Sequence, residues 1–166
     1  MNENNAQINE EILYREWVPA GKVIKIIMLS VFLLNSIIGI IIIAFIPKNL
    51  IFIGWIFGAV SLLLCLLYWN FRGIRIALTI DYIDVDYGIF NHKKILLEKI
   101  IRCEITKAYF RRYGGIGVRF GLDGSWAYTT DFGQAVKLFF QKGRPFVFST
   151  RNPQKICHLI NEITRI

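Results

Sequence analysis

Metal-binding and nucleophilic residues are scarce in this sequence. Its 166 residues include two histidines and three cysteines, and none of them lies in a C-x-x-C, H-E-x-x-H or G-x-S-x-G pattern. Cys157 and His158 are neighbours on an expected helix, where adjacent side chains point in different directions. The sequence therefore predicts no catalytic residues, no metal site and no cofactor, and we do not expect an enzyme.

A nucleotide-binding fingerprint is also missing. The stretch YGGIGVRFGLDGSWAYTT, Tyr113 to Thr130, has five glycines in its first twelve residues, but no Gly-Lys-Ser/Thr follows them. The next element is expected to be a strand, whereas a phosphate loop leads into a helix whose amides hold the anion. We interpret these glycines as turn residues and as sites of close strand packing.

Apolar residues are abundant instead. They make up 54% of the chain, and the mean hydropathy is +0.44. Two long apolar runs, 23–46 and 50–69, flank a turn at Pro47, and each is long enough to cross a bilayer as a helix. A cleaved signal peptide is disfavoured because the first run is too long and the second follows at once. The chain therefore divides into an N-terminal segment (1–22), a transmembrane helical hairpin (23–70) and a C-terminal domain (71–166).

Basic residues flank the outer ends of the two spans and are scarce in the turn between them. They are Arg15, Lys22, Lys25, Arg72 and Arg75 at the outer ends, against Lys48 in the turn. This distribution predicts that both termini face the cytoplasm. Trp17, Tyr68 and Trp69 would lie at the same interface, where amphipathic rings are favoured.

The net charge of +8 belongs to the C-terminal domain, because the four basic residues before position 71 are balanced by four acidic ones. A cationic domain beside a membrane is attracted to anionic headgroups. The stretch KAYFRRYGG is the best candidate for binding a lipid or a partner; it could equally be a solvated sheet edge. Its candidate residues are Lys107, Tyr109, Phe110, Arg111, Arg112 and Tyr113. No motif for binding nucleic acid accompanies them.

Five polar or small positions have structural and functional interpretations. Asn35 lies near the centre of the first span, and Gly54 and Gly58 form a G-x-x-x-G pattern in the second. They would pack the two helices of one hairpin or form a dimer seam. Asp84 and Asp86 alternate along a strand and share a face, where solvent-facing residues are the favoured interpretation. The alternative is a membrane enzyme or a transporter accessory subunit that uses Asp84 and Asp86 or Asn35.

The cysteines are odd in number. Cys65 is expected to pack within the second span, and Cys103 and Cys157 are expected as free thiols in a cytoplasmic domain.

Beyond residue 71 the pattern changes to short alternating segments separated by turn residues, which predicts an antiparallel sheet. The candidate strands are 73–80, 82–90, 93–100, 101–110, 116–121, 125–131, 135–141 and 145–150. A helix follows, with Asn152 as its N-cap, Pro153 at its first position, and apolar residues at helical spacing. Before the spans, the segment around 8–17 could be an interfacial helix or a strand.

The C-terminal half resembles bacterial pleckstrin-homology-like (PH-like) membrane proteins. The motifs that carry the resemblance are GGIGVRF, GSWAYTT, GQAVKLFFQKGRPFVFST and RNPQKICHLINEI, in that order. The resemblance implies a membrane-anchored α+β protein in which a seven-stranded antiparallel barrel, capped by a C-terminal helix, follows the hairpin. It also implies a location in the bacterial inner membrane.

PH-like domains serve as binding and scaffolding modules. The expected function is therefore non-enzymatic, with the domain binding a protein partner, a second copy of itself, or an anionic membrane surface. Where phosphoinositide-binding members carry a basic cluster, this chain has the acidic stretch TIDYIDVD, so phosphoinositide recognition is not expected to carry over.

Overall fold

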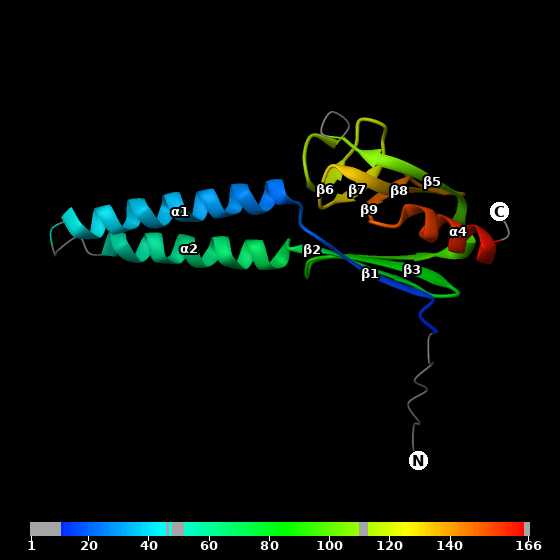
Figure 1. Cartoon of the computed structure of the whole chain (residues 1–166), viewed down its shortest axis with the longest axis horizontal. Coiled ribbons are helices and arrows are strands. Elements are labelled where there is room, and N and C mark those ends of the chain that lie inside the picture. The colour runs from blue at the N-terminus through cyan, green and yellow to red at the C-terminus, as the bar shows by residue number, and fades with distance from the viewer. Residues whose placement is uncertain (1–10, 46, 48–51, 110–112, 165–166) are drawn as a thin grey trace, which may run out of the picture.

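A computed structural model describes residues 11–45, 47, 52–109 and 113–164 (Figure 1). Its helices are α1 (Lys22–Phe45), α2 (Phe52–Asn70) and α4 (Pro153–Thr164). Its strands are β1 (Tyr14–Pro19), β2 (Gly73–Leu78), β3 (Tyr82–Tyr87), β4 (Asn91–Leu96), β5 (Ile100–Ala108), β6 (Gly117–Phe120), β7 (Trp126–Thr129), β8 (Gly133–Phe140) and β9 (Phe146–Ser149). The first two helices lie side by side and project from a domain built of strands and α4 (Figure 1).

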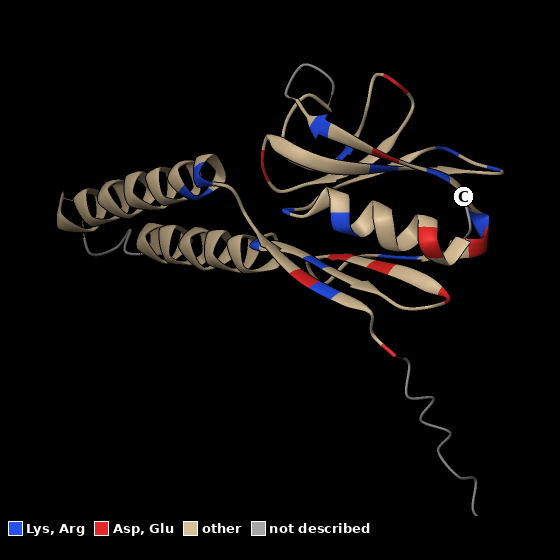
Figure 2. Ribbon diagram, turned by 45° about the vertical axis from the view of Figure 1, so that its right-hand side comes forward, with Lys and Arg blue, Asp and Glu red and all other residues tan. Residues whose placement is uncertain are grey.

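Helices α1 and α2 are long and apolar enough to cross a membrane. At 1.5 Å per residue, the 24 residues of α1 extend about 36 Å, which exceeds a bilayer's hydrocarbon core. In the most apolar 18-residue stretch of each helix, 6% of the residues of α1 and 0% of those of α2 are buried. Neither helix is therefore the buried core helix of a soluble domain. Charged residues of the described hairpin lie only at its domain end (Figure 2).

Of the three polar or small positions expected to pack the two helices, Asn35 and Gly54 lie at the contact between them and Gly58 does not. The side-chain amide of Asn35 donates hydrogen bonds to Ser61 Oγ at 2.7 Å and to the Phe57 carbonyl oxygen at 3.3 Å, both on α2. A Cβ added at Gly54 would lie 2.9 Å from the Ile43 side chain, whereas one added at Gly58 would meet nothing within 4 Å. Asn35 and Gly54 therefore pack the hairpin, and Gly58 lies outside that seam.

The first sheet joins strands from both sides of the hairpin. Its order is β1-β2-β3-β4, and every neighbouring pair is antiparallel. Strand β1 precedes α1 and pairs along its whole length with β2, which follows α2, so Trp17 lies opposite Arg75. The N-terminal segment therefore contributes a strand, and the hairpin is an insertion between two paired strands.

The second sheet departs from the expected antiparallel seven-stranded barrel. Its order is β5-β8-β9-β7-β6, and β7 pairs with β9 in parallel. The parallel pair arises because β9 folds back from β8 and occupies the space between β8 and β7. The described strands form two sheets of four and five strands, and no closed barrel is seen among them.

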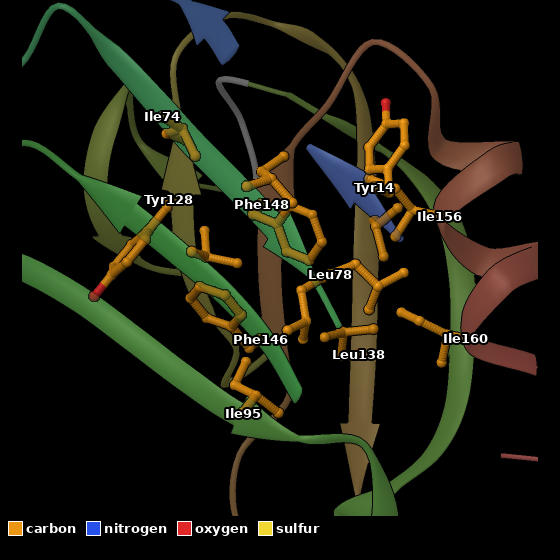
Figure 3. Close-up of a cluster of buried hydrophobic side chains, with 14 of the residues drawn as sticks. Tyr14, Ile74, Leu78, Ile95, Tyr128, Leu138, Phe146, Phe148, Ile156 and Ile160 are labelled. Atoms are coloured by element: carbon orange, nitrogen blue, oxygen red, sulfur yellow. The ribbon is translucent and has the colours of Figure 1, made fainter. Parts of the chain in front are cut away.

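The main core lies between the sheets and is closed by α4 (Figure 3). The predicted helix is confirmed: it begins at Pro153, and Ile156 and Ile160 are fully buried on its inner face. They meet the inward face of the strands, where hydrophobic side chains alternate with exposed polar ones. The buried residues drawn in Figure 3 include Tyr14, Ile74, Leu78, Ile95, Tyr128, Leu138, Phe146 and Phe148.

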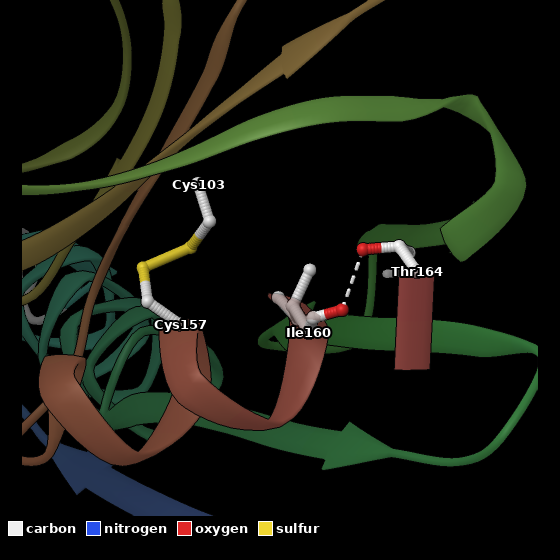
Figure 4. The surroundings of a disulfide bond; sticks show 4 residues. All are labelled: Cys103, Cys157, Ile160 and Thr164. Atoms are coloured by element: carbon white, nitrogen blue, oxygen red, sulfur yellow. Dashed lines mark hydrogen bonds between the residues drawn. A yellow bond between two sulfur atoms is a disulfide. The ribbon is translucent and has the colours of Figure 1, made fainter. Parts of the chain in front are cut away.

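The expectation of free thiols at Cys103 and Cys157 is wrong. Cys103 on β5 and Cys157 on α4 form a disulfide that spans 54 residues of sequence (Figure 4). The pairing follows from the packing of α4 against β5, which brings the two Cα atoms to 5.5 Å. Cys65 is free and exposed on α2.

Among the described residues, backbone and side-chain hydrogen bonds attach both ends of the hairpin to the domain. The Ala20 N–H donates to the Arg72 carbonyl at 2.7 Å, and the Gly21 N–H donates to the Thr130 carbonyl at 2.8 Å. The Ile89 N–H donates to the side-chain oxygen of Asn70, the last residue of α2, at 2.7 Å. These contacts define a hairpin end of the domain, which includes the start of β2, the β3–β4 turn and the β7–β8 turn.

Candidate functional site

A pocket lies at the hairpin end of the domain, where β1, α1, α2 and β2 meet. It has a volume of about 710 Å³. We call it the hairpin-end pocket. Its lining consists of Arg15, Glu16, Trp17, Pro19, Lys25, Tyr68, Arg72 and Arg75.

Strand pairing positions the aromatic centre of this pocket. Tyr14 and Val18 of β1 are buried, so the alternating residues Arg15 and Trp17 face outward. The Trp17 ring then lies close to two guanidinium groups, because Arg75 is its cross-strand partner and Arg72 precedes β2. Both groups lie 5.7 Å from the Trp17 ring centre, and Arg72 is also 6.0 Å from the Trp69 ring.

These contacts orient the arginines without neutralising them. A guanidinium held over an aromatic face keeps its edge N–H groups available for an acceptor. The four cations that line the pocket take part in none of the ion pairs found among the described residues. The site therefore concentrates positive charge beside exposed aromatic rings.

Glu16 is the one carboxylate in the lining, and its oxygens are occupied elsewhere. The Thr150 hydroxyl donates to Glu16 Oε2 at 2.6 Å, and the Arg151 N–H donates to Oε1 at 3.0 Å. Hydrogen bonds from these two neutral donors fix the Glu16 carboxylate beside Thr150, and its negative charge offsets one of the four positive charges in the lining.

A second cluster lies on the same outer face of the first sheet and consists of Asp84, Asp86 and His92. His92 Nδ1 contacts the Asp86 carboxylate and lies 3.4 Å from Asp84 Oδ1. The hydrogen bond to Asp86 raises the pKa of His92, and burial followed by the nearby Asp86 charge raises the pKa of Asp84. The arrangement stabilises a protonated imidazole between two carboxylates.

The same cluster has the composition of a cation site. One ligand atom from each of Asp84, Asp86 and His92 lies within 4.8 Å of the other two. Two carboxylates and an imidazole suit a divalent transition metal. In this geometry, however, the imidazole itself serves as their cationic partner, and Arg75 and Lys94 are only the cross-strand neighbours of Asp86 and Asp84 in the register. We therefore interpret the cluster as a charge network of the sheet surface.

The predicted KAYFRRYGG site is only partly described. Phe110, Arg111 and Arg112 lie outside the described residues. Lys107 is on β5, and Tyr109 follows it with an exposed ring. Ala108 pairs with Gly133 in the β7–β8 turn region, so this part of the stretch lies at the hairpin end of the domain.

Tyr113 does not belong to any exposed site. It is 3% exposed and packs with Ala108, Ala127, Ala135 and Val147 in a small second core. Its ring therefore stabilises the domain interior and cannot reach a headgroup or a partner.

The sequence contained the parts of the hairpin-end pocket but did not reveal their association. Arg72, Arg75, Trp17 and Tyr68 were each expected near an interface. Their convergence depends on β1 pairing with β2, and helix and strand remained equally acceptable for β1. The outward alternation of Arg15 and Trp17 was the available signal.

No known family, curated protein or solved structure matches the chain.

Proposed function

We propose that the protein crosses a membrane with α1 and α2 and binds the phosphate of an anionic lipid headgroup in the hairpin-end pocket. The carrying observation is the convergence of Arg15, Lys25, Arg72 and Arg75 around Trp17 at the domain end of two apolar helices. If the helices span a bilayer, this pocket lies at the depth of the headgroups.

The arginines suit this ligand. Guanidinium groups bind phosphate through paired N–H donors, and Arg72 and Arg75 are both held near the Trp17 ring. The rings of Trp17 and Tyr68 match the amphipathic zone beneath the headgroups. A neutral protein surface would leave these charges desolvated without a partner, so the site favours an anionic lipid over a scaffolding partner.

We further propose that the domain is PH-like. A four-stranded meander packed against a second sheet, with a C-terminal helix closing the core, supports this assignment. The acidic stretch TIDYIDVD (79–86) contributes no residue to the lining of the hairpin-end pocket.

We place the protein in a bacterial inner membrane with both termini cytoplasmic. The support is the concentration of Lys and Arg at the outer ends of the spans. The Cys103–Cys157 disulfide is a counter-argument, since such bonds persist mainly in oxidising compartments. The orientation in which a span inserts is set by the charges that flank it. We therefore give the flanking charges priority over the disulfide in assigning the side of the membrane.

Titration of a short-chain phosphatidylglycerol into the full chain in neutral detergent tests the proposed binding by calorimetry. We expect saturable binding that weakens with salt, and no comparable binding of phosphatidylcholine. Replacing Arg72 and Arg75 together by Gln should weaken binding by about tenfold or more, because two charge-assisted hydrogen-bonding groups are lost. Equal binding of both lipids, or unchanged affinity in the double variant, would falsify the proposal.

A further inference from the structure

The turn between β3 and β4 presents two large apolar side chains to its surroundings. Ile89 is 81% exposed and Phe90 is 85% exposed. They are adjacent in sequence at the tip of a tight turn, after Gly88, and the strands on either side of it pack against the core. An exposed apolar pair at the tip of an ordered turn is typical of a contact surface.

The turn is fixed beside the end of α2. The Ile89 N–H donates to Asn70 Oδ1 at 2.7 Å, and Asn70 is the last residue of that helix. Gly88 has a φ of +75°, and a Cβ there would collide with the Asn70 carbonyl oxygen. The close approach therefore requires glycine, and it holds the two apolar side chains at the level of the helix end.

The surroundings of the turn are continuous with the hairpin. A cavity of about 140 Å³ joins Gly88 and Ile89 to Trp69, Asn70 and Arg72. Trp69 is itself exposed at the end of α2. The same cavity is also lined by the charged residues Arg75 and Asp86. A surface on which apolar and aromatic side chains at the end of an apolar helix adjoin charged ones matches the transition from hydrocarbon to headgroups.

We propose that the β3–β4 turn inserts Ile89 and Phe90 into the interfacial layer of the bilayer that α1 and α2 cross. The inference rests on the membrane-crossing part of the proposed function and is independent of headgroup binding by the arginines. Insertion gives the domain a third attachment to the membrane besides the two helices. This further attachment restricts the tilt of the domain and holds the hairpin-end pocket against the headgroups.

The chain supplies a matched control at Leu122, in the β6–β7 turn. Leu122 is 89% exposed, so it equals Phe90 in exposure and apolar character. It lies at the opposite end of β7 from Thr130, whose carbonyl binds Gly21 at the hairpin end. The length of β7 therefore separates the β6–β7 turn from the hairpin end, and we expect Leu122 to remain in water.

Fluorescent labelling of the full chain in phosphatidylglycerol and phosphatidylcholine liposomes tests the insertion. Cys65 is replaced by Ala, and Phe90→Cys or Leu122→Cys is labelled with an environment-sensitive dye without reductant, so that the Cys103–Cys157 disulfide stays closed. Both substitutions fall on exposed side chains, and circular dichroism verifies that each labelled protein is folded. Lipids that carry a nitroxide in the upper acyl chain act as the quencher.

We expect blue-shifted emission from the dye at position 90, with quenching about twofold or more above that at position 122. Equal emission and quenching at the two positions would overturn the proposal. A blue shift at position 90 without nitroxide quenching would also overturn it, because protein would then cover the turn. Failure of this test leaves the lipid titration of the arginine variants unaffected, so the two proposals fail separately.

Discussion

Glu16 and Thr150 lie 134 residues apart and are joined by a hydrogen bond of 2.6 Å from the threonine hydroxyl to the carboxylate. Glu16 is on β1, before the hairpin, and Thr150 follows β9 of the second sheet. A second bond, from the Arg151 N–H, satisfies the other carboxylate oxygen. This contact ties the N-terminal strand to the C-terminal sheet.

Replacing Glu16 by Ala should lower the free energy of unfolding of the domain by about 1.5 to 3 kcal/mol, the range for hydrogen bonds to charged groups. Denaturant unfolding of the full chain in detergent provides the measurement. Glu11→Ala is the matched control, because Glu11 is exposed and should change stability by less than about 0.5 kcal/mol. Equal effects of the two substitutions would contradict the assigned role of Glu16.

A fragment of residues 71–166 should not fold stably, because it lacks β1. Tyr14 and Val18 of that strand are part of the main core, and their removal would expose the whole edge of β2. Circular dichroism and proton NMR of the purified fragment measure this. A chain that retains β1 and replaces residues 22–70 by a short Gly-Ser linker should fold, since the Ala20 N–H already contacts the Arg72 carbonyl. Dispersed spectra from the shorter fragment would show that β1 is dispensable.

The double substitution Cys103→Ser with Cys157→Ser should lower the unfolding free energy by about 4 kcal/mol, because the bond closes a loop of 54 residues in the unfolded chain. The comparison is made by denaturant unfolding against Cys65→Ser, whose cysteine is free. Mass spectrometry after alkylation of unreduced membranes reports whether the bond exists in cells. Two alkylated thiols at positions 103 and 157 would contradict the disulfide.

Asp86→Asn should lower the pKa of His92 toward its ordinary value of 6.5, because the hydrogen bond to Asp86 is the main cause of the increase. A raised pKa means that the interaction stabilises the fold fully below pH 6.5, and that this contribution is lost as the pH rises through the folded-state pKa. NMR titration of the His92 ring protons gives the pKa directly. Asp81→Asn removes an exposed carboxylate beyond the opposite end of β3 and should leave the titration of His92 unchanged. An unchanged His92 pKa in Asp86→Asn would contradict the assignment.

The elements with strong periodicity could be predicted from the sequence, and the pairings between distant elements could not. The two apolar runs and the Pro153 helix were identifiable because each depends on local composition. The position of β1 depends on β2, which is more than fifty residues away across the hairpin, and the parallel pairing of β7 with β9 depends on β8. Register of this kind is set by tertiary packing, which a single sequence does not encode locally.

The candidate site shows the same limit. Trp17 and Arg75 had the correct chemistry, but only the β1–β2 register brings them opposite each other. Tyr113 had the chemistry of an interfacial residue, yet it packs in the interior. Burial of an aromatic ring that is flanked by polar residues depends on neighbours from β7, β8 and β9.

Native mass spectrometry of lipids retained by the full chain tests the central claim most directly. The protein is purified from membranes that contain phosphatidylglycerol and phosphatidylcholine. The double variant Arg72→Gln/Arg75→Gln is compared with a control double variant, Lys99→Gln/Lys142→Gln. The control also removes two positive charges, but from exposed positions at the far end of the domain. We predict preferential retention of phosphatidylglycerol by the wild type and by the lysine variant, and its loss from the arginine variant. Equal retention by all three proteins, or equal loss from both variants, would contradict headgroup binding in the hairpin-end pocket.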